Sequence, residues 1–487
     1  MPPEHAPPTH RDLRGLVLTG GAFLFARQVA SMGLSLIGLF IVTRIIGPES
    51  YGAYATAFGI SQCSQNFGQT GIAVYLVRHA KEVSEHDYRV ASTLLLAMSL
   101  FLVLCFEAAA DLVGEWVEVP QFPILFRVIV LSLPLQFLGT VASARLARAL
   151  DFRRSAIIEF VAQLAYYLAA IPLALSGLGA WSLVSAWIVQ QVVSCVLFHT
   201  ASRYAFVPAW SRSLVAAMVV YGTQFSIANA WSQLRSLVNP LIVGHFLGAE
   251  AVGYVALTAR MVEVLAVVRT ITFRLSIAAF GRIQDDKAKL VRAITDAMQL
   301  QTLAIAPMLL AFSWFGALVF IPLVGERWLP VIALFPYVAL GNLSLAQFNV
   351  HASALYVVNR NLQVSVFTSL NLVLLAAGCA ATVTQAGIIG YGYGELLALP
   401  SYLVLHLFVV RYIGAPDYRV SFIWWLGAAI GLFWRELGWW AILAPFLALV
   451  FPSSIRQIRG FVTIVWRNWR TPLASEPSGP SDADLPA

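Results

Sequence analysis

The sequence has 487 residues, of which 59% are hydrophobic and only 11% are charged, and its mean hydropathy is +0.77. This composition excludes a soluble protein, whose surface needs far more charge, and predicts an all-α polytopic membrane protein. The formal net charge of +7 could suit nucleic acid or an acidic partner. We expect no nucleic-acid partner, because the distribution of basic residues along the chain explains most of this charge.

Apolar segments of about 20 residues or more, each long enough to cross a membrane as a helix, recur along the chain. Residues 1–14 are predicted to be a polar cytoplasmic tail without a cleavable signal peptide, because the following apolar run is too long. Helices are predicted over 16–45, 52–77, 90–112, 124–147, 156–176, 180–202, 213–246, 252–277, 293–323, 329–357, 362–383 and 388–412. Two shorter, less regular segments, 421–434 and 437–451, bring the expected total to about 14 spans.

Beyond these spans, residues 455–470 repeat apolar side chains at helical spacing, opposed by arginines. This pattern predicts an amphipathic helix lying on the inner leaflet. The final segment, 471–487, is rich in Pro, Ser and Asp and is expected to be disordered.

Basic residues fall on alternate connections between the predicted helices. If the N-terminus is cytoplasmic, 23 of the 31 lysines and arginines lie on the cytoplasmic side, and only Arg44, Arg327 and Arg435 lie outside. The excess of positive charge therefore predicts cytoplasmic N- and C-termini.

A turn motif occurs twice, 201 positions apart. The segment "RIIGPESYGAYA" starts at Arg44 and "HFLGAEAVGYVA" at His245, and "ASARLARALDFR" from Ala142 matches "ASALYVVNRNLQ" from Ala352. Any tight helical hairpin needs glycines, but the matching hydropathy and the second paired segment favour an internal repeat. We therefore predict two pseudo-symmetric six-helix lobes in parallel orientation, 15–202 and 213–412, joined by a cytoplasmic linker at 203–212, with substrate at their interface.

Five arginines lie within predicted helices. Arg127 and Arg269 are near helix ends, from which their side chains can reach the membrane surface. Arg27, Arg235 and Arg260 are deeper, where an arginine costs about 2.5–3.5 kcal/mol unless it faces water or a partner. These three are candidates for a polar cavity, the alternative being a structural ion pair or a backbone-carbonyl partner.

Polar residues at helical spacing mark further cavity candidates on four helices. They are Ser31, Gln62, Asn66, Gln69, Gln224, Asn239, Asn342 and Asn349. Hydrogen bonds between packed helices are an equally open explanation for them. Arg260 and Glu263 are three residues apart and can pair on one helix face, and Glu263 and Glu395 are the best-placed acids for ion coupling or gating.

The sequence contains no signature of a metal, a cofactor or a catalytic centre. Cys63, Cys105, Cys195 and Cys379 fall inside apolar runs without metal-ligand or disulfide spacing, and no Walker A sequence is present. We expect neither a cofactor nor an enzymatic activity.

Ordered segments over roughly 15–412 resemble one known family. They are "RIIGPESYGAYATAFGISQCSQNFGQTGIAVYLVR", "ARLARALDFRRSAIIEF", "GLGAWSLV" from Gly177 and "FLGAEAVGYVALTARM" from Phe246. The chain resembles the polysaccharide transporter family of Wzx-type flippases, within the multidrug, oligosaccharidyl-lipid and polysaccharide exporter superfamily. The "DFRR" segment is most similar to the branch that handles colanic-acid and exopolysaccharide intermediates.

The resemblance implies a flippase of the bacterial inner membrane that moves an undecaprenyl-diphosphate-linked oligosaccharide to the periplasmic leaflet by alternating access. It also implies a functional monomer, with a polymerase and chain-length regulator as possible partners. A multidrug antiporter of the same superfamily is an alternative, although its cavity would favour carboxylates. A membrane polymerase or ligase is a further alternative, but its catalytic loop would exceed the longest outside connection, "EWVEVPQFP".

Overall fold

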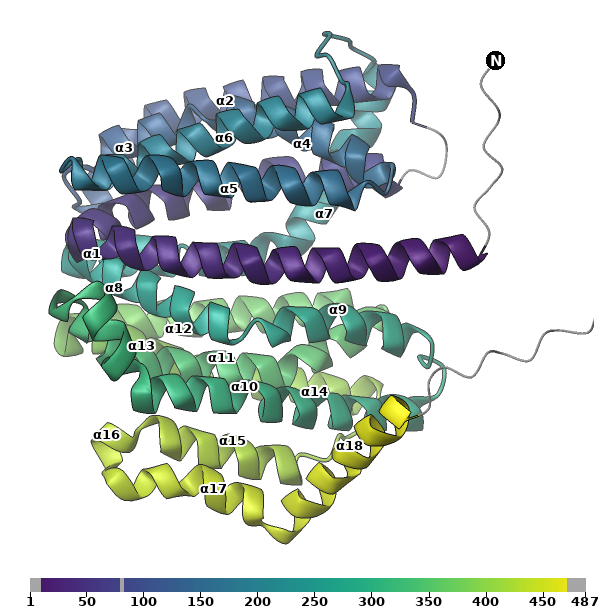
Figure 1. Cartoon of the computed structure of the whole chain (residues 1–487), viewed down its shortest axis with the longest axis vertical. Helices are drawn as coiled ribbons and strands as arrows, with labels where there is room; N and C mark the ends of the chain where they lie inside the picture. The colour runs from purple at the N-terminus through teal and green to yellow at the C-terminus, as the bar shows by residue number, and fades with distance from the viewer. Residues whose placement is uncertain (1–9, 79–82, 471–487) are drawn as a thin grey trace, which may run out of the picture.

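The computed structural model describes residues 10–78 and 83–470, without the side chains of 10–29, 64–70, 224–232, 274 and 464–470. Within these residues the regular structure is entirely helical. Two helical lobes lie side by side with α1 (His10–Arg78) between them, and the C-terminal helices pack on the far side of the second lobe (Figure 1). The predicted all-α, two-lobed fold is therefore confirmed.

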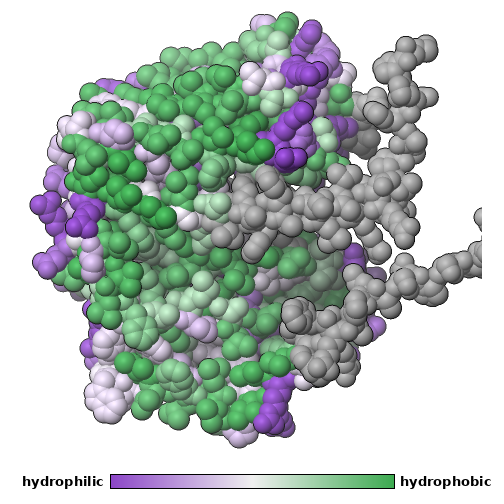
Figure 2. All heavy atoms as spheres, viewed as in Figure 1, coloured by the Kyte–Doolittle hydropathy of each residue, from purple (hydrophilic) through white to green (hydrophobic). Residues whose placement is uncertain are grey.

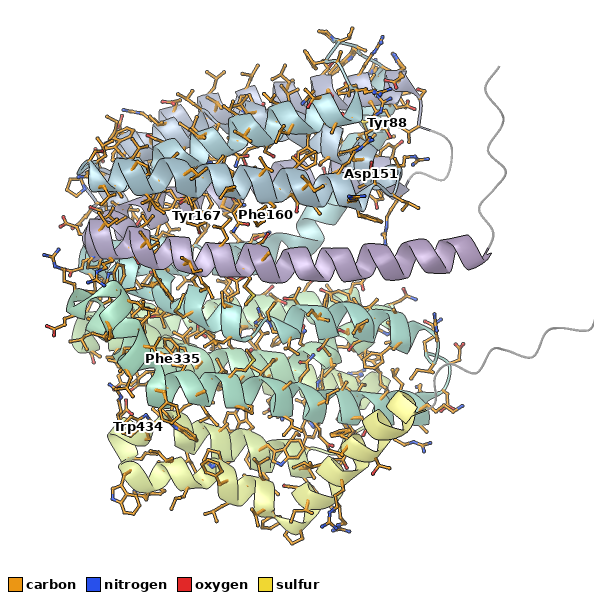
Figure 3. The ribbon with its side chains drawn as sticks, in the orientation of Figure 1. Tyr88, Asp151, Phe160, Tyr167, Phe335 and Trp434 are labelled. Atoms are coloured by element: carbon orange, nitrogen blue, oxygen red, sulfur yellow. The ribbon has the colours of Figure 1, made fainter. Side chains whose placement is uncertain are left out.

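The first lobe runs from α1 to α6. The remaining helices of this lobe are α2 (Glu85–Val117), α3 (Phe122–Val130), α4 (Leu133–Arg148), α5 (Phe152–Leu175) and α6 (Ala180–Ser202). Polar caps begin two of them: Ser84 and Asp87 form a capping box on α2, and Asp151, labelled in Figure 3, accepts the backbone N–H of Arg154 on α5. These side chains satisfy N–H groups that the first helical turn leaves free.

The second lobe repeats this arrangement with more breaks in its helices. It contains α7 (Arg212–Arg235), η1 (Asn239–Val243), α8 (Gly244–Leu265), α9 (Val268–Gly281), α10 (Lys287–Val324), η2 (Glu326–Trp328), α11 (Leu329–Val357), α12 (Asn361–Ala386), α13 (Ile389–Leu397) and α14 (Ser401–Tyr412). Met218 near the start of α7 is buried in the core of the first lobe, whereas Val238, just past its end, belongs to the core of the second. The helix α7 therefore crosses from one lobe to the other.

The chain continues into a hairpin and a final helix. These elements are α15 (Arg419–Leu432), α16 (Trp434–Leu437), η3 (Trp439–Ile442), α17 (Leu443–Val450) and α18 (Pro452–Arg470). The helix α18 covers the segment predicted to be amphipathic and departs from the preceding segment by 63°. Its location on the membrane surface stays a prediction, and the segment 471–487 lies outside the described residues.

The repeated turn has the same backbone conformation in both lobes. Gly47 has φ 76° and ψ 174°, and Gly248 has φ 76° and ψ −174°. Only glycine adopts this region without strain. The chain reverses direction at each glycine, and we call the end of the molecule where they lie the turn end and the opposite end the tail end (Figure 1).

The two lobes meet at the turn end through two further glycines. A Cβ atom on Gly52 would overlap the carbonyl oxygen of Ala249, and one on Gly253 would overlap that of Pro48. Ala249 and Pro48 are also 201 positions apart, so the two contacts are related by the internal symmetry, as in an isologous interface. Close backbone approach at small residues is how helices pack in membranes, where apolar burial alone gives no preference.

The outside of the molecule is apolar. Large side chains such as Leu104, Leu112 and Leu318 are more than two-thirds exposed, and apolar surface covers most of the visible face (Figure 2). Such a surface needs lipid rather than water around it.

Ten helices in the described residues are long and apolar enough to cross a membrane, or up to eleven if Trp439–Val450 and Pro452–Thr463 form one bent span. The chain is thus a multi-pass membrane protein. The expected total of about 14 spans fits this count, since the first span found, Ala30–Cys63, runs through the turn at Gly47.

Candidate functional site

A cavity of about 1210 Å³ lies between the two lobes. Its lining extends from Tyr51 near the turn end to Phe273 and Tyr356 toward the tail end. In Figure 2 the surface is hollowed between the lobes in the half toward the tail end. A polar, water-accessible space at a lobe interface is where a transporter built from parallel repeats binds its substrate.

Arg235 ends α7 and projects into the wall that the second lobe contributes. Its Nη2 donates to both carboxylate oxygens of Glu395, at 2.8 and 2.7 Å, and its Nη1 donates to Oδ1 of Asn371 at 2.8 Å. Asn371 is held in turn by its own bond to Ser401 Oγ (2.9 Å). Glu395 is buried, so the carboxylate neutralises the arginine in a low-dielectric part of the wall.

Arg260 and Glu263 on α8 form the predicted pair, with 3.0 Å between Nη1 and Oε2. Their side chains are 43% and 63% exposed, so the pair faces the cavity and is not buried among helices as its depth in the sequence suggested. Arg260 Nη2 also donates to Ser35 Oγ of the first lobe at 3.2 Å. This bond links the two lobes in the part of α1 that precedes the Gly47 turn.

Arg269 lies in the cavity wall, which corrects the expectation that it reaches the membrane surface from a helix end. The predicted helix is broken, with α8 ending at Leu265 and α9 starting at Val268. Arg269 is the second residue of α9, at this break inside the predicted span, and the cavity lining continues past it to Phe273. Its Nη1 donates to Asn342 Oδ1 (2.8 Å), and its carbonyl oxygen accepts from Asn349 Nδ2 (3.3 Å).

Arg269 differs from the other two cavity arginines in its charge partners. Arg235 and Arg260 each have a carboxylate partner, whereas within the described part of the chain Arg269 forms no ion pair. The described cavity wall therefore carries one uncompensated positive charge. Arg127, by contrast, lies away from the cavity and pairs with Glu107 and Asp111 of α2.

The cavity wall from the first lobe has a different chemistry. It combines six aromatic rings with three side-chain amides, from α1, α5 and α6: Tyr51, Tyr54, Phe58, Tyr166, Tyr167 and Trp187, with Gln62, Gln163 and Gln190. We call this set the first-lobe wall. None of its described members is charged.

The structure brings together most of the candidates inferred from sequence. Eight line the cavity: Arg235, Arg260, Gln62, Asn239, Asn342, Asn349, Glu263 and Glu395. Ser31 does not line it and instead accepts a bond from Gln163 through its carbonyl oxygen. The side chains of Arg27, Asn66, Gln69 and Gln224 lie outside the described residues.

Sequence reasoning missed Arg269, Asn371 and the aromatic rings as cavity residues. Asn371 lies near the middle of the predicted helix 362–383, and an amide at that depth in a span was a usable signal. The aromatic rings carried no signal, because aromatic residues are frequent throughout membrane proteins.

Hydrogen bonds join the two lobes at the turn end. Arg44 Nη1 donates to the carbonyl oxygens of Pro322 (2.6 Å) and Leu323 (3.1 Å), near the end of α10. His245, its counterpart in the repeat, donates through Nδ1 to the carbonyl oxygen of Trp116 (2.6 Å), near the end of α2. We call these two symmetric contacts the turn-end clasp.

Two indole groups reinforce the turn-end clasp. Trp116 Nε1 donates to Leu241 O (3.0 Å), and Trp328 Nε1 donates to Thr43 O (3.3 Å). The rings of Trp116 and His245 are also stacked, with 4.3 Å between their centroids. The carbonyls that Arg44 and His245 bind lie in the last turns of α10 and α2, where a helix leaves its carbonyls free.

Two lobes of membrane-spanning helices around a central polar cavity define a two-lobed membrane transporter fold. The same fold occurs in a solved structure titled "Lipid II flippase MurJ, inward closed conformation", with a TM-score of 0.66, 13% identity and coverage of 92% of this chain and 100% of that one. An inward-facing multidrug resistance MATE transporter of the MOP superfamily gives a TM-score of 0.59 at 16% identity, over 80% of this chain and 98% of that one. These similarities show the fold alone.

Residues 41–333 match the family described as "Polysaccharide biosynthesis protein", and the chain belongs to this family. The succinoglycan biosynthesis transport protein ExoT of Rhizobium meliloti (strain 1021) is 27% identical over 320 residues, 63% of each chain. The lipopolysaccharide biosynthesis protein WzxC of Escherichia coli (strain K12) is 24% identical over 340 residues, 68% of each chain. The family resemblance noted in the sequence is thereby confirmed.

Proposed function

We propose that this protein is a flippase that moves an undecaprenyl-diphosphate-linked oligosaccharide from the cytoplasmic to the periplasmic leaflet of a bacterial inner membrane. Membership of the polysaccharide biosynthesis family and the names of ExoT and WzxC support this substrate class. The cavity, at about 1210 Å³, exceeds the range of roughly 300–1,000 Å³ typical of small-molecule sites. It can hold a large polar headgroup while the lipid chain stays in the bilayer.

The uncompensated charge of Arg269 is the observation that carries the proposal. A diphosphate brings negative charge and several acceptor oxygens, which guanidinium groups bind through charge-assisted hydrogen bonds. Arg269 is already oriented by Asn342, so it can accept an anion without first giving up a carboxylate. The cavity candidates Arg235 and Arg260 would complete the diphosphate contact, and the amides would bind sugar hydroxyls.

Alternating access is the mechanism we assign. In this scheme the turn-end clasp closes one end of the cavity, and the positive-inside rule predicts that the tail end, with both termini, faces the cytoplasm. This conformation would therefore load from the cytoplasmic side. Release would require the clasp to open while the lobes close at the tail end.

Glu263 and Glu395 are the coupling or gating candidates in this scheme. Each carboxylate holds a cavity arginine, so a diphosphate that binds Arg260 or Arg235 competes with Glu263 or Glu395. A displaced carboxylate is then free to take up a proton or sodium ion. Substrate binding and ion binding would be linked through the same two arginines.

The protein would act without catalysis and as a monomer, since one chain supplies both lobes. A polymerase and chain-length regulator would take the flipped product, as the family resemblance implies. The reaction it serves is then a translocation step, with no bond made or broken.

Transport by purified protein in liposomes tests the proposal. The readout is movement of an undecaprenyl-diphosphate oligosaccharide between leaflets by the wild type, Arg269→Ala, Arg269→Lys and Arg127→Ala. We expect Arg269→Ala to lose about 10- to 100-fold in transport, because one charge-assisted contact is worth about 1.5–3 kcal/mol. Arg269→Lys should keep part of the activity and Arg127→Ala nearly all of it.

Two results would contradict the proposal. If the wild type exports cationic dyes against an ion gradient and moves no lipid-linked sugar, the protein is a multidrug antiporter instead. Wild-type lipid transport with a fully active Arg269→Ala variant would keep the flippase but remove Arg269 from the diphosphate site.

A further inference from the structure

The two walls of the cavity differ in charge. All charged residues among its described lining come from the second lobe: Arg235, Arg260, Glu263, Arg269 and Glu395. The first-lobe wall offers aromatic rings and amides only. The second lobe also contributes aromatic rings, including Tyr391 and Tyr402, so the absence of charge is what distinguishes the first-lobe wall.

The rings of the first-lobe wall are positioned by contacts among themselves. Tyr54 and Phe58 are stacked, with ring centroids 5.3 Å apart and an interplanar angle of 19°. Phe58 meets Trp187 edge to face at 4.8 Å, and Tyr166 meets Tyr167 in the same way at 4.9 Å. These arrangements are the favourable ones for aromatic pairs, and the Phe58–Trp187 contact joins α1 to α6.

Polar atoms of two rings are already used within the first lobe. Trp187 Nε1 donates to Ser132 Oγ at 3.2 Å, and Tyr167 OH donates to the carbonyl oxygen of Ser35 at 3.0 Å. Figure 3 shows Tyr167 on α5, near α1. With these atoms occupied, the two residues have their ring surfaces left to offer a ligand.

The amides supply the complementary polar groups. Gln62 Oε1 is inaccessible to solvent and has no hydrogen-bond partner within the described structure. A buried carbonyl oxygen without a donor is costly, and a ligand hydroxyl would satisfy it once the Gln62 side chain turns toward the cavity that it lines. Gln190 lines the same wall.

Sugars have the matching chemistry. A pyranose ring presents C–H groups on its faces, which the negative face of an aromatic ring attracts, and hydroxyls at its rim, which amides bind. A diphosphate fits this wall poorly, because no described residue there balances its charge. It fits the arginine-bearing wall opposite.

We infer that the two lobes divide the substrate: the second lobe holds the diphosphate, and the first-lobe wall holds the sugars and selects among them. This inference rests on the proposed function. Phe58 and Trp187 are its central residues, because they form the contact between α1 and α6, and Gln62 adds specificity through its free acceptor. Substitutions in this wall change which headgroup is bound, and substitutions of Arg269 change whether the lipid diphosphate is bound at all.

Binding of three lipids to the full chain, followed by native mass spectrometry in detergent, tests the division. The probes are undecaprenyl diphosphate and the same lipid carrying glucose or galactose. The variants are Phe58→Ala, Trp187→Ala, Trp187→Phe, Gln62→Leu and Arg269→Ala. Trp434→Ala is the matched control, because Trp434 lies on α16, far from the cavity lining (Figure 3).

We expect wild type to bind at least one sugar-bearing lipid about fivefold tighter than undecaprenyl diphosphate. We expect the ratio of the two affinities, sugar-bearing lipid over undecaprenyl diphosphate, to fall in Phe58→Ala, Trp187→Ala and Gln62→Leu. Their affinity for undecaprenyl diphosphate itself should stay unchanged, which also shows that these variants fold. Trp187→Phe should keep most of the ratio. Arg269→Ala should weaken the binding of all three lipids by a similar factor.

The inference would be overturned if wild type bound all three lipids equally, or if the first-lobe variants kept the wild-type ratio. The inference would also fail if these variants weakened the binding of undecaprenyl diphosphate as much as the binding of its sugar-bearing forms. Binding of none of the lipids by wild type would be a different outcome, since it would refute the proposed function itself.

Discussion

Arg235 and Glu395 form the most buried ion pair in the described cavity wall, with side chains 28% and 5% exposed. Removing two charges from water is expensive, and their attraction repays this cost only when the geometry is good. Asn371 supports that geometry, because it accepts a bond from Arg235 and donates one to Ser401 Oγ. The pair therefore stabilises the fold only as long as both partners are present.

This argument predicts how substitutions of the pair combine. Glu395→Leu alone should lower the melting temperature strongly, because an unpaired buried charge costs about 3–5 kcal/mol. The double variant Arg235→Met, Glu395→Leu should recover much of that loss while failing to transport. Thermal unfolding of wild type, both single variants and the double variant, arranged as a double-mutant cycle, measures the coupling. Additive losses would show that the two residues do not stabilise each other.

The elements around the turns form a symmetric joint between the lobes. Gly52 and Gly253 let two helices approach until backbone meets backbone, and the turn-end clasp adds hydrogen bonds on each side of this crossing. Each bond contributes about 1 kcal/mol. A joint of this kind is strong enough to hold one conformation and weak enough to open.

Disturbing this joint should expose the cavity at the turn end. Gly253→Ala places a methyl group against the Pro48 carbonyl oxygen, and Arg44→Ala removes two hydrogen bonds. The reporter is Ser236→Cys, an exposed cavity residue, in a chain whose four native cysteines are replaced, because Cys63 also lines the cavity. Both changes should speed labelling by an impermeant maleimide applied to spheroplasts.

Gly33→Ala is the matched control for this experiment, since a Cβ there would meet nothing within 4 Å. It should label at the parental rate. Unchanged labelling in Gly253→Ala and Arg44→Ala would mean that the turn-end clasp does not close the cavity.

At the scale of the whole molecule, the even number of predicted spans and the arrangement of basic residues predict that the tail end faces the cytoplasm. Single cysteines in the cysteine-free chain test this orientation. Glu49→Cys at the turn end should react in intact spheroplasts, and Val207→Cys in the segment between α6 and α7 only after permeabilisation. Leu437→Cys should behave like Glu49→Cys if α15 and α17 are both full spans. The reverse labelling of positions 49 and 207 would invert the orientation.

Much of this architecture follows from the sequence by itself. The membrane class, the two lobes, the repeated turn and eight of the candidate cavity residues come from hydropathy, helical period and the 201-residue repeat. These features are local or periodic along the chain. A buried arginine or a glycine turn has a high cost outside a special environment, so its presence in an apolar run already indicates that environment.

Other features were decided only by tertiary structure. Arg269, expected to reach the membrane surface, lines the cavity at the start of α9, and the approach of α12 and α13 selected Asn371 and Glu395 as partners of Arg235. The aromatic first-lobe wall also appeared only once α1, α5 and α6 had packed. Which charges remain unpaired, and which side chains share a wall, depends on contacts between residues far apart in the chain, and such contacts leave no periodic trace in a single sequence.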